Sequence, residues 1–326
     1  MSSLRLMERK RTLGFGLESD AHKFTNNETL NSANYIHGVY AIEYSKEIAM
    51  YMRALATGDW SKHLSMSGKM SGTVSFSVDF QEGATVSNAP SYFAMLRACA
   101  MSHNSNATGT WLITDSREDR NPATIEIVER EEGPTPRQKV VKLYGCMGNA
   151  KLVLDSIGNP VKVDFEFKGA IGSVGTRAYA SIITPSSFDT TIPAAVLSAT
   201  INLFSTIMYL SKFTIDLGNV LEPFTDPTNT GGIDGFHVVD RNPSMEMDPD
   251  MRIPSDIDLH ANHTTETTGA LSISIGSKFT LSAPVAQLVQ TDNPTTREGH
   301  VADQIRLEFK RSSGNDEFEI LHGSKT

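Results

Sequence analysis

The densest group of residues that could hold a metal ion or perform acid–base chemistry lies between residues 248 and 260. Its members are four carboxylates and one imidazole, namely Asp248, Asp250, Asp256, Asp258 and His260. A calcium loop would need an oxygen ligand where Arg252 stands and a glycine where Pro254 stands. On a helix, Asp256 and Asp258 are instead carboxylates near the N-terminus, which the helix dipole favours. The pattern therefore predicts a structural role and no metal site.

The other candidates for chemistry each lack part of their motif. Gly14 and Gly16 have no third glycine after them and no strand pattern before them, so they do not form a phosphate loop. The two cysteines, Cys99 and Cys146, belong to no CxxC or Cys/His cluster, and Cys99 fits the apolar face of a helix. No GxSxG or HExxH motif occurs. We therefore predict no catalytic, cofactor-binding or metal-binding residue, and a protein that is not an enzyme.

Composition and charge exclude further classes of protein. The 326 residues carry a net charge of −9, which opposes non-specific binding to DNA, RNA or anionic membranes. Apolar residues make up 39% of the chain, enough for a packed core. Two cysteines are too few for a disulfide framework. The longest apolar stretch, residues 192–210, contains too many polar residues to span a membrane, so a soluble protein is expected.

A first unit of alternating strands is predicted over residues 67–169. Residues 72–80 alternate apolar and polar side chains, as do residues 161–169, which is typical of strands with one buried face. Between them lie a helix over residues 87–102, with Asn88 as N-cap, and a hairpin formed by residues 124–130 and 138–146. Residues 150–156 add a further strand.

Two longer segments flank this unit. Residues 1–66 are predicted to form an N-terminal arm with one short helix over residues 45–58, where Ile48, Tyr51, Met52 and Leu55 have helical spacing. Residues 170–194, rich in Gly, Ser, Thr and Pro, are predicted to form a connecting loop or hairpin. Both are expected to become ordered on assembly. Removal of residues 2–30 should then leave a folded chain that cannot polymerise.

A second unit is predicted over residues 195–326. It has strands at 198–204 and 211–219, a helix at 254–269 with Ser255 and Asp258 as a capping box, and a hairpin at 270–288 that turns at Gly276. A two-faced strand at 300–312 closes it. Phe76 and Phe165 are 89 residues apart, and Ile215 and Leu307 are 92 apart (165 − 76 and 307 − 215). These spacings favour a duplication, with a chance match of strand patterns as the alternative.

Six blocks of this sequence resemble the tail tube proteins of long-tailed phages, and they come in the order of that family. They are KMSGTVSFSVDF, SYFAMLRACAMS, VVKLYGCMGNAKLVLDSIGNPVKVDFEFKGAIGS, LSKFTIDLGNVLEP, GFHVVDRNPSMEMDP and IRLEFKRSSGNDEFEI. The resemblance extends from about residue 13 to the C-terminus. It implies a mainly β fold of tandem β-sandwich or barrel domains, each with one flanking α-helix.

The resemblance also implies a function and partners. The chain would be a structural virion protein, assembled in the host cytoplasm, whose stacked rings form a hollow tail tube for DNA ejection. Three chains with pseudo-sixfold symmetry would make a ring, or six chains if the duplication is absent. Tape-measure, tail terminator and distal tail proteins would be partners, and DNA would pass without specific binding; no membrane or cofactor is implied.

Two other classes remain as alternatives. A β-sandwich adhesin or carbohydrate-binding module would account for the strands, although Phe and Tyr fall mainly within the predicted strands and helix and not in loops. A hydrolase would have to use the acidic and histidine group, and Asp256→Ala would then abolish its activity.

Overall fold

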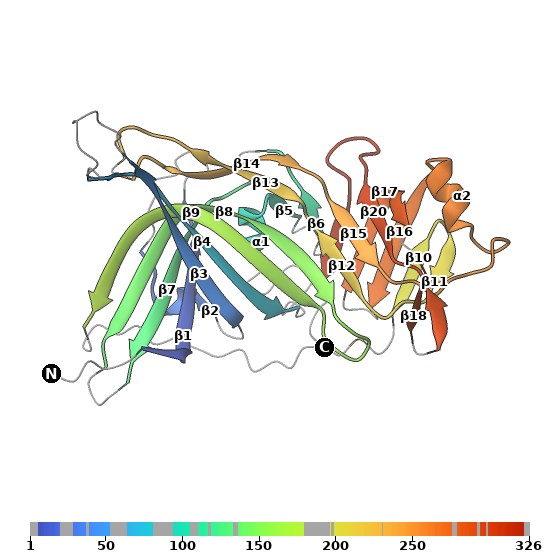
Figure 1. Cartoon of the computed structure of the whole chain (residues 1–326), viewed down its shortest axis with the longest axis horizontal. Helices are drawn as coiled ribbons and strands as arrows, with labels where there is room; N and C mark the ends of the chain where they lie inside the picture. The colour runs from blue at the N-terminus through green and yellow to red at the C-terminus, as the bar shows by residue number, and fades with distance from the viewer. Residues whose placement is uncertain are drawn as a thin grey trace, which may run out of the picture.

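The computed structural model describes residues 6–19, 29–36, 39–52, 64–80, 94–104, 110–116, 119–132, 136–178, 196, 199–229, 231–275, 279–291, 294–297 and 299–322. As predicted, the fold is mainly β (Figure 1). The first half contains β1 (Leu6–Leu17), η1 (Ser32–Asn34), β2 (Tyr35–Ile36), β3 (Val39–Tyr51), β4 (Met66–Asp79), α1 (Ala94–Ala98), β5 (Met101–Asn104), β6 (Thr110–Ile113), β7 (Ala123–Glu131), β8 (Gln138–Leu154) and β9 (Lys162–Arg177).

The second half continues with shorter strands and one helix. It contains β10 (Thr200–Leu203), β11 (Thr206–Met208), β12 (Phe213–Asp216), β13 (Asn219–Phe224), β14 (Gly235–Arg241), β15 (Ser244–Met247), α2 (Leu259–Thr264), β16 (Thr268–Ile275), β17 (Phe279–Thr291), β18 (Thr295–Arg297), β19 (His300–Ala302), β20 (Ile305–Phe309) and β21 (Glu319–His322). Figure 1 shows the two halves side by side along the long axis.

The two halves repeat one strand order. In the first half, neighbouring strands follow the order β3-β4-β9-β8-β7-β1-β2. In the second half the order is β12-β15-β20-β17-β16-β10-β11. All of these pairings are antiparallel, and corresponding strands also come in the same sequence order, with a helix after β4 and after β15. This shared topology is what a duplicated unit would produce.

The residue match proposed from the sequence was wrong for the second half. Phe76 and Phe165 are direct cross-strand partners on β4 and β9. Ile215 is not opposite Leu307, because β15 lies between them and Met245 pairs with both. The counterpart of β4 is therefore β15. The domain boundaries predicted at residues 67 and 195 stay predictions.

The predicted N-terminal arm with a short helix is also wrong. β1 pairs with β7 along its length, and Leu13 and Phe15 are buried in the core. Residues 45–51 belong to β3, whose 13 residues pair with β4, so the helical spacing there marks no buried face. Ile48, Tyr51 and Met52 are exposed, and Leu55 lies outside the described residues. Removal of residues 2–30 would therefore take a core strand out of the fold.

Several shorter predictions need correction. The described part of the first helix covers only Ala94–Ala98, because the chain enters β5 at Met101; Asn88 lies outside the described residues. The strands predicted at 138–146 and 150–156 are one continuous strand, β8. The predicted connection at 170–194 begins as part of β9, which continues to Arg177, and residues 179–195 lie outside the described part.

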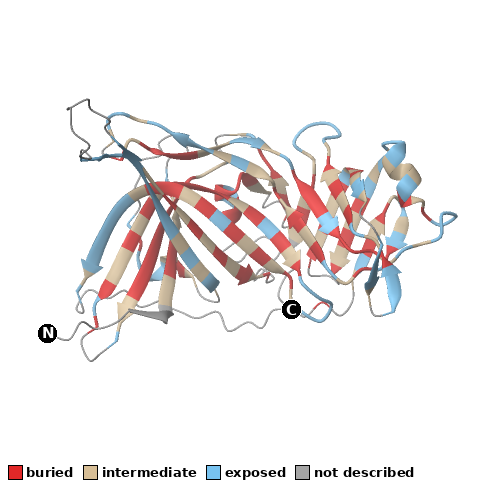
Figure 2. Ribbon diagram, in the orientation of Figure 1, coloured by how far each residue is buried: buried red, intermediate tan, exposed pale blue. Residues whose placement is uncertain are grey.

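The core fills the space that the curved sheets enclose, and its side chains alternate along each strand. Phe165 and Phe167 of β9 are at most 2% exposed, and both pack against Phe76 of β4, Phe167 with its ring stacked and Phe165 with its ring tilted. Gly148 allows this packing because a Cβ there would lie 2.4 Å from the Phe167 ring. Figure 2 shows buried residues as stripes across both halves. The two-faced strands predicted at 72–80 and 161–169 are confirmed in β4 and β9. The strand predicted at 300–312 is confirmed only over Ile305–Phe309, which form β20, because His300–Ala302 form a separate strand, β19, that pairs with β18.

A cluster of charged side chains ties four strands of the first half together. The carboxylate of Glu129 on β7 accepts hydrogen bonds of 2.8 Å from Arg11 Nη2 on β1 and from Lys139 Nζ on β8. Lys139 Nζ also donates to Tyr44 Oη of β3 at 2.7 Å. Burial alone would raise the pKa of Glu129, but the hydrogen bonds from Lys139 and Arg11 lower it below its ordinary value of 4.5. The cluster therefore stabilises the fold only while Glu129 is ionised.

A Glu129→Gln variant should be less stable than the parent protein by about 1–3 kcal/mol at pH 7, since the two cations lose a charged acceptor. Because folding lowers this pKa, the stabilisation is complete above 4.5 and is lost as the pH falls through the lower folded value. Urea unfolding should thus show a difference between the two proteins that shrinks on acidification. The exposed Glu222→Gln serves as control. A pH-independent difference would contradict the assigned ion pairs.

Candidate assembly site

The structure divides the acidic and histidine group among an ion-pair cluster around Arg297, an ion pair with Arg252 and a helix cap. The Asp248 carboxylate accepts hydrogen bonds from Ser211 N, Ser211 Oγ and Lys212 N, and it forms an ion pair with Arg297. Asp250 pairs with the same arginine, and Asp256 lies 3.9 Å from Arg252. Asp258 is the N-cap of α2 and accepts from Ala261 N at 2.8 Å.

The predicted capping box at α2 is therefore wrong in part, because the cap is Asp258 alone and Ser255 lies in the preceding turn. His260 lies in the first turn of α2 and is exposed. Within the described residues, no group of three or more His, Cys, Asp or Glu side chains could hold a metal ion. Each carboxylate of the predicted group thus stabilises a turn, a hairpin or a helix end.

The remaining candidates are also part of the packing. Gly14 and Gly16 lie in β1, where a Cβ would come within 3.0 Å and 2.6 Å of the Leu30 side chain. Cys99 and Cys146 are free thiols that are completely buried, and burial raises the pKa of both. A buried neutral thiol is a poor nucleophile.

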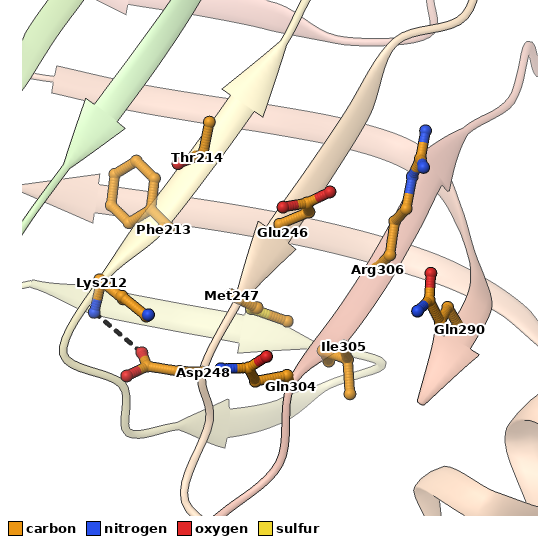
Figure 3. A pocket seen from close by; sticks show the side chains of 10 residues that line it. All are labelled: Lys212, Phe213, Thr214, Glu246, Met247, Asp248, Gln290, Gln304, Ile305 and Arg306. Atoms are coloured by element: carbon orange, nitrogen blue, oxygen red, sulfur yellow. Dashed lines mark hydrogen bonds between the residues drawn. The ribbon is translucent and has the colours of Figure 1, made fainter. Parts of the chain in front are cut away.

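A pocket of about 220 Å³ lies in the second half across β12, β15, β20 and β17 (Figure 3). Its lining includes Thr214, Glu246, Arg306 and Gln290, which lie on four neighbouring strands. At its lower end, Lys212 N donates to Asp248 at 2.9 Å. Burial alone would raise the pKa of Asp248, but hydrogen bonds from Ser211 and Lys212 lower it overall. Polar and charged side chains thus share the lining of this pocket with Phe213, Met247 and Ile305, which are buried.

Eight strands form one continuous antiparallel sheet through both halves, in the order β3-β4-β9-β8-β12-β15-β20-β17. The halves join where the last residues of β8, Lys151–Leu154, pair with β12. The sheet thus consists of two sets of four corresponding strands. Its two outermost strands, β3 and β17, correspond to the two strands that meet at this joint, β12 and β8.

The joint between β8 and β12 combines an ion pair with side-chain hydrogen bonds. Lys151 Nζ lies 2.9 Å from Asp216 Oδ2, and Asn149 donates to Asp216 Oδ1 at 2.7 Å. Asn219 Nδ2 donates to the carbonyl oxygens of Cys99 and Gly148. The hydrogen bond to Asp216 raises the pKa of Lys151. Burial alone would raise the pKa of Asp216, but the hydrogen bonds that Asp216 accepts from Asn149 and Lys151 lower this pKa overall. Both groups are therefore charged at neutral pH.

The edges at the two ends of this sheet have no neighbouring strand in the described part of the chain, but other elements contact both of them. Arg11 Nη1 donates to Ile42 O on β3, and His263 Nε2 of α2 lies 3.1 Å from Val289 O on β17. Within the described residues, no strand pairs with the side of β3 that faces away from β4. On β17, pairing with β16 ends at Gln287, which leaves one side of Leu288–Thr291 without a neighbouring strand in the described part of the chain. Unpaired edges of this length are sites where a further chain can add.

The far half of the hairpin formed by β3 and β4 is exposed and carries several apolar side chains among polar ones. Its side chains Ile48, Met50, Tyr51 and Met66 are 48–67% exposed. Figures 1 and 2 show this part of the hairpin projecting beyond the sheet. The corresponding hairpin, β13–β14, instead lies on the sheet, with Ile233 and Phe236 packed against Met147 and Ala170. Contiguous exposed apolar side chains of this kind mark an interaction surface.

Sequence reasoning did not find these edges. Strand alternation shows which face of a strand is buried, but pairing partners depend on contacts between distant segments. The predicted duplication was the one sequence feature that pointed to these edges. If the two halves of the chain are equivalent, the contact between them within one chain should have a counterpart between neighbouring chains.

A family model described as phage tail tube protein matches residues 56–310. None of the curated proteins matches the sequence significantly. No helix in the described part of the chain is long and apolar enough to cross a membrane. The family model spans 255 of the 326 residues (310 − 56 + 1), and the chain therefore belongs to the phage tail tube proteins, structural components of the virion that assemble into a tube.

Proposed function

We propose that three chains close into a ring and that stacked rings form the conduit through which phage DNA is ejected. The observation that carries this proposal is the continuous sheet of two corresponding four-strand sets. Three chains of eight strands would give a barrel of 24 strands (3 × 8) with pseudo-sixfold symmetry. Closure would remove the unpaired edges that a free chain exposes.

The joint inside the chain supplies a template for the joint between chains. β17 corresponds to β8 and β3 to β12, so we place β17 of one chain antiparallel to β3 of the next. Matching the strands at their ends puts Gln290 in the place of Lys151 and Glu43 in the place of Asp216. The ion pair of the internal joint would become a pair between an amide and a carboxylate.

The exposed part of the β3–β4 hairpin supports further contacts between copies. Because its counterpart is packed against a sheet, we infer that a second copy covers Ile48, Met50, Tyr51 and Met66 on assembly. Residues 170–194 are a second candidate for such contacts. Tape-measure, tail terminator and distal tail proteins would meet the ends of the tube, and assembly would occur in the host cytoplasm.

The proposed role needs no catalysis, cofactor or metal. The acidic and histidine group, on which a hydrolase would depend, is divided among separate ion pairs and a helix cap. Membership of the tail tube family favours a conduit over the alternative of an adhesin or carbohydrate-binding module.

Native mass spectrometry of the assembling protein tests the ring stoichiometry. The chain has a mass of 35.6 kDa, so a ring of three should appear near 107 kDa and a ring of six near 214 kDa (3 × 35.6 and 6 × 35.6). We expect the smaller ring as the unit that adds to growing tubes. Rings of six chains, or monomers at concentrations where tubes are visible in electron micrographs, would overturn the proposal.

A further inference from the structure

The part of the eight-stranded sheet around the joint carries almost equal numbers of acidic and basic side chains on the face that points away from the core. This part consists of residues 73–79 of β4, 162–168 of β9 and 149–154 of β8, with β12, β15, β20 and the residue directly after β20. Its basic residues are Lys151, Lys162, Lys168, Arg306 and Lys310, and its acidic residues are Asp79, Asp164, Glu166, Asp216, Glu246 and Glu308. The other basic residues of these strands, Lys69, Lys139, Lys142 and Arg177, lie farther along β4, β8 and β9. Five cations and six anions leave a formal charge of −1 (5 − 6), against −9 for the whole chain. The acidity of the chain therefore lies mainly elsewhere.

Register places seven of these eleven charges directly opposite a charge of the other sign. Asp79 is the direct cross-strand partner of Lys162, and Glu246 is the partner of Arg306. Lys151 lies between two carboxylates, those of Asp164 and Asp216. On these six strands, no described pair of direct partners carries like charges. Opposite charges directly across a sheet attract, and like charges repel.

The pair at the joint between the halves shows how a cation on this face is held. Lys151 has a side chain that is 50% exposed, whereas the Asp216 side chain is 26% exposed. Asp216 is fixed from three directions, by Lys151, by Asn149 and by the backbone N–H of Gly218. It is thus a positioned counter-charge beside a lysine that would otherwise extend into solvent.

We propose that this face is the wall next to the DNA and that its carboxylates keep its cations away from the phosphates. The inference rests on the proposed function, because only ring closure makes this face line a channel. A free lysine or arginine on such a wall would bind phosphate and release counterions, an attraction that every ring of the tube would repeat. Local pairing, and not the acidity of the whole chain, then lets DNA slide.

Binding of a short fluorescent DNA duplex tests the proposal, with anisotropy for the unassembled chain and co-sedimentation for tubes. Asp216→Asn frees Lys151 and should increase DNA binding severalfold at low salt, with a log–log salt dependence that steepens by about one per freed cation. Asp256→Asn is the matched control, because it changes the net charge equally but lies beside α2 and pairs with Arg252. Lys151→Gln combined with Asp216→Asn should return DNA binding to the parent level.

A second wall variant guards against loss of the internal joint. Glu308→Gln leaves β12 and β8 untouched and removes the ion-pair partner of Lys310, so it should also increase DNA binding. Equal binding by the wall variants and Asp256→Asn would overturn the proposal, as would increased binding that persists when Lys151 is also removed. Electron micrographs of the same samples distinguish failure of this proposal from failure of the proposed function. Absence of tubes in the parent protein would contradict the proposed function, but it would leave the pairing of charges on this face untouched.

Discussion

A Gln290→Glu variant is expected to fold as the parent protein does but to lose ring and tube formation. Gln290 lies at the exposed end of β17, and Glu43 lies on β3 at the opposite edge of the sheet. In the proposed ring these two residues face each other across the joint between chains, in the places of Lys151 and Asp216. Gln290→Glu would place two carboxylates directly opposite each other, so the contact between an amide and a carboxylate would be replaced by repulsion between like charges. Size-exclusion chromatography and electron microscopy would show monomers.

Companion variants make this result specific. Gln290→Glu combined with Glu43→Gln removes the repulsion and should restore rings, whereas Gln290→Lys should reproduce the internal ion pair and make rings more resistant to dilution. Circular dichroism should show unchanged strand content in all three, since both residues are exposed in the free chain. Normal tubes from Gln290→Glu, or no rescue by the second substitution, would mean that these edges do not meet.

The largest effect on stability is expected from Phe167→Ala. Phe167 is completely buried, and its ring lies 5.7–5.9 Å from those of Phe15, Phe76 and Phe165, which come from three strands. The Phe167→Ala substitution removes these ring contacts and leaves a cavity. Gly148, which lies against the Phe167 ring, has no side chain that could fill this cavity. Such changes cost about 3–5 kcal/mol.

Chemical unfolding followed by tryptophan fluorescence would measure the loss. Phe224→Ala is the control, because Phe224 is 43% exposed on β13 and surface substitutions usually change stability by about 0.5 kcal/mol or less. A loss below about 1 kcal/mol for Phe167→Ala would contradict the assignment of Phe167 to the centre of the core.

The strands that could be predicted from sequence are those with one buried and one polar face. β4, β9 and β20 have strict alternation, so their local pattern already contains the information that decides their structure. The hairpin of β16 and β17 was predicted for the same reason and is confirmed, although Gly276 lies outside the described residues.

The elements that could not be predicted are those fixed by distant partners. β1 has a charged first half and two glycines, so its alternation is weak, and its place depends on pairing with β7, more than 100 residues away. β15 has only four residues between two prolines, and its partners β12 and β20 define it as a strand. β3 contains good helix formers, but pairing with β4 outweighs that local preference.

The candidate site could be predicted only in outline. The family resemblance implied an assembly of rings, and membership of the tail tube family is shown by the match over residues 56–310. Which edges are open, and which joint serves as template, required the pairing of β8 with β12. Matching Ile215 with Phe76 from the sequence treated β12 as the counterpart of β4, whereas the counterpart is β15. That mismatch hid the correspondence between β12 and β3.

An electron cryomicroscopy map of assembled tubes, at a resolution that separates strands, tests the central claim most directly. It should show rings of three chains in which Leu288–Thr291 of β17 runs antiparallel to the start of β3 in the next chain, closing a barrel of 24 strands. Rings of six chains, or rings in which β17 and β3 keep open edges and other surfaces meet, would contradict the account.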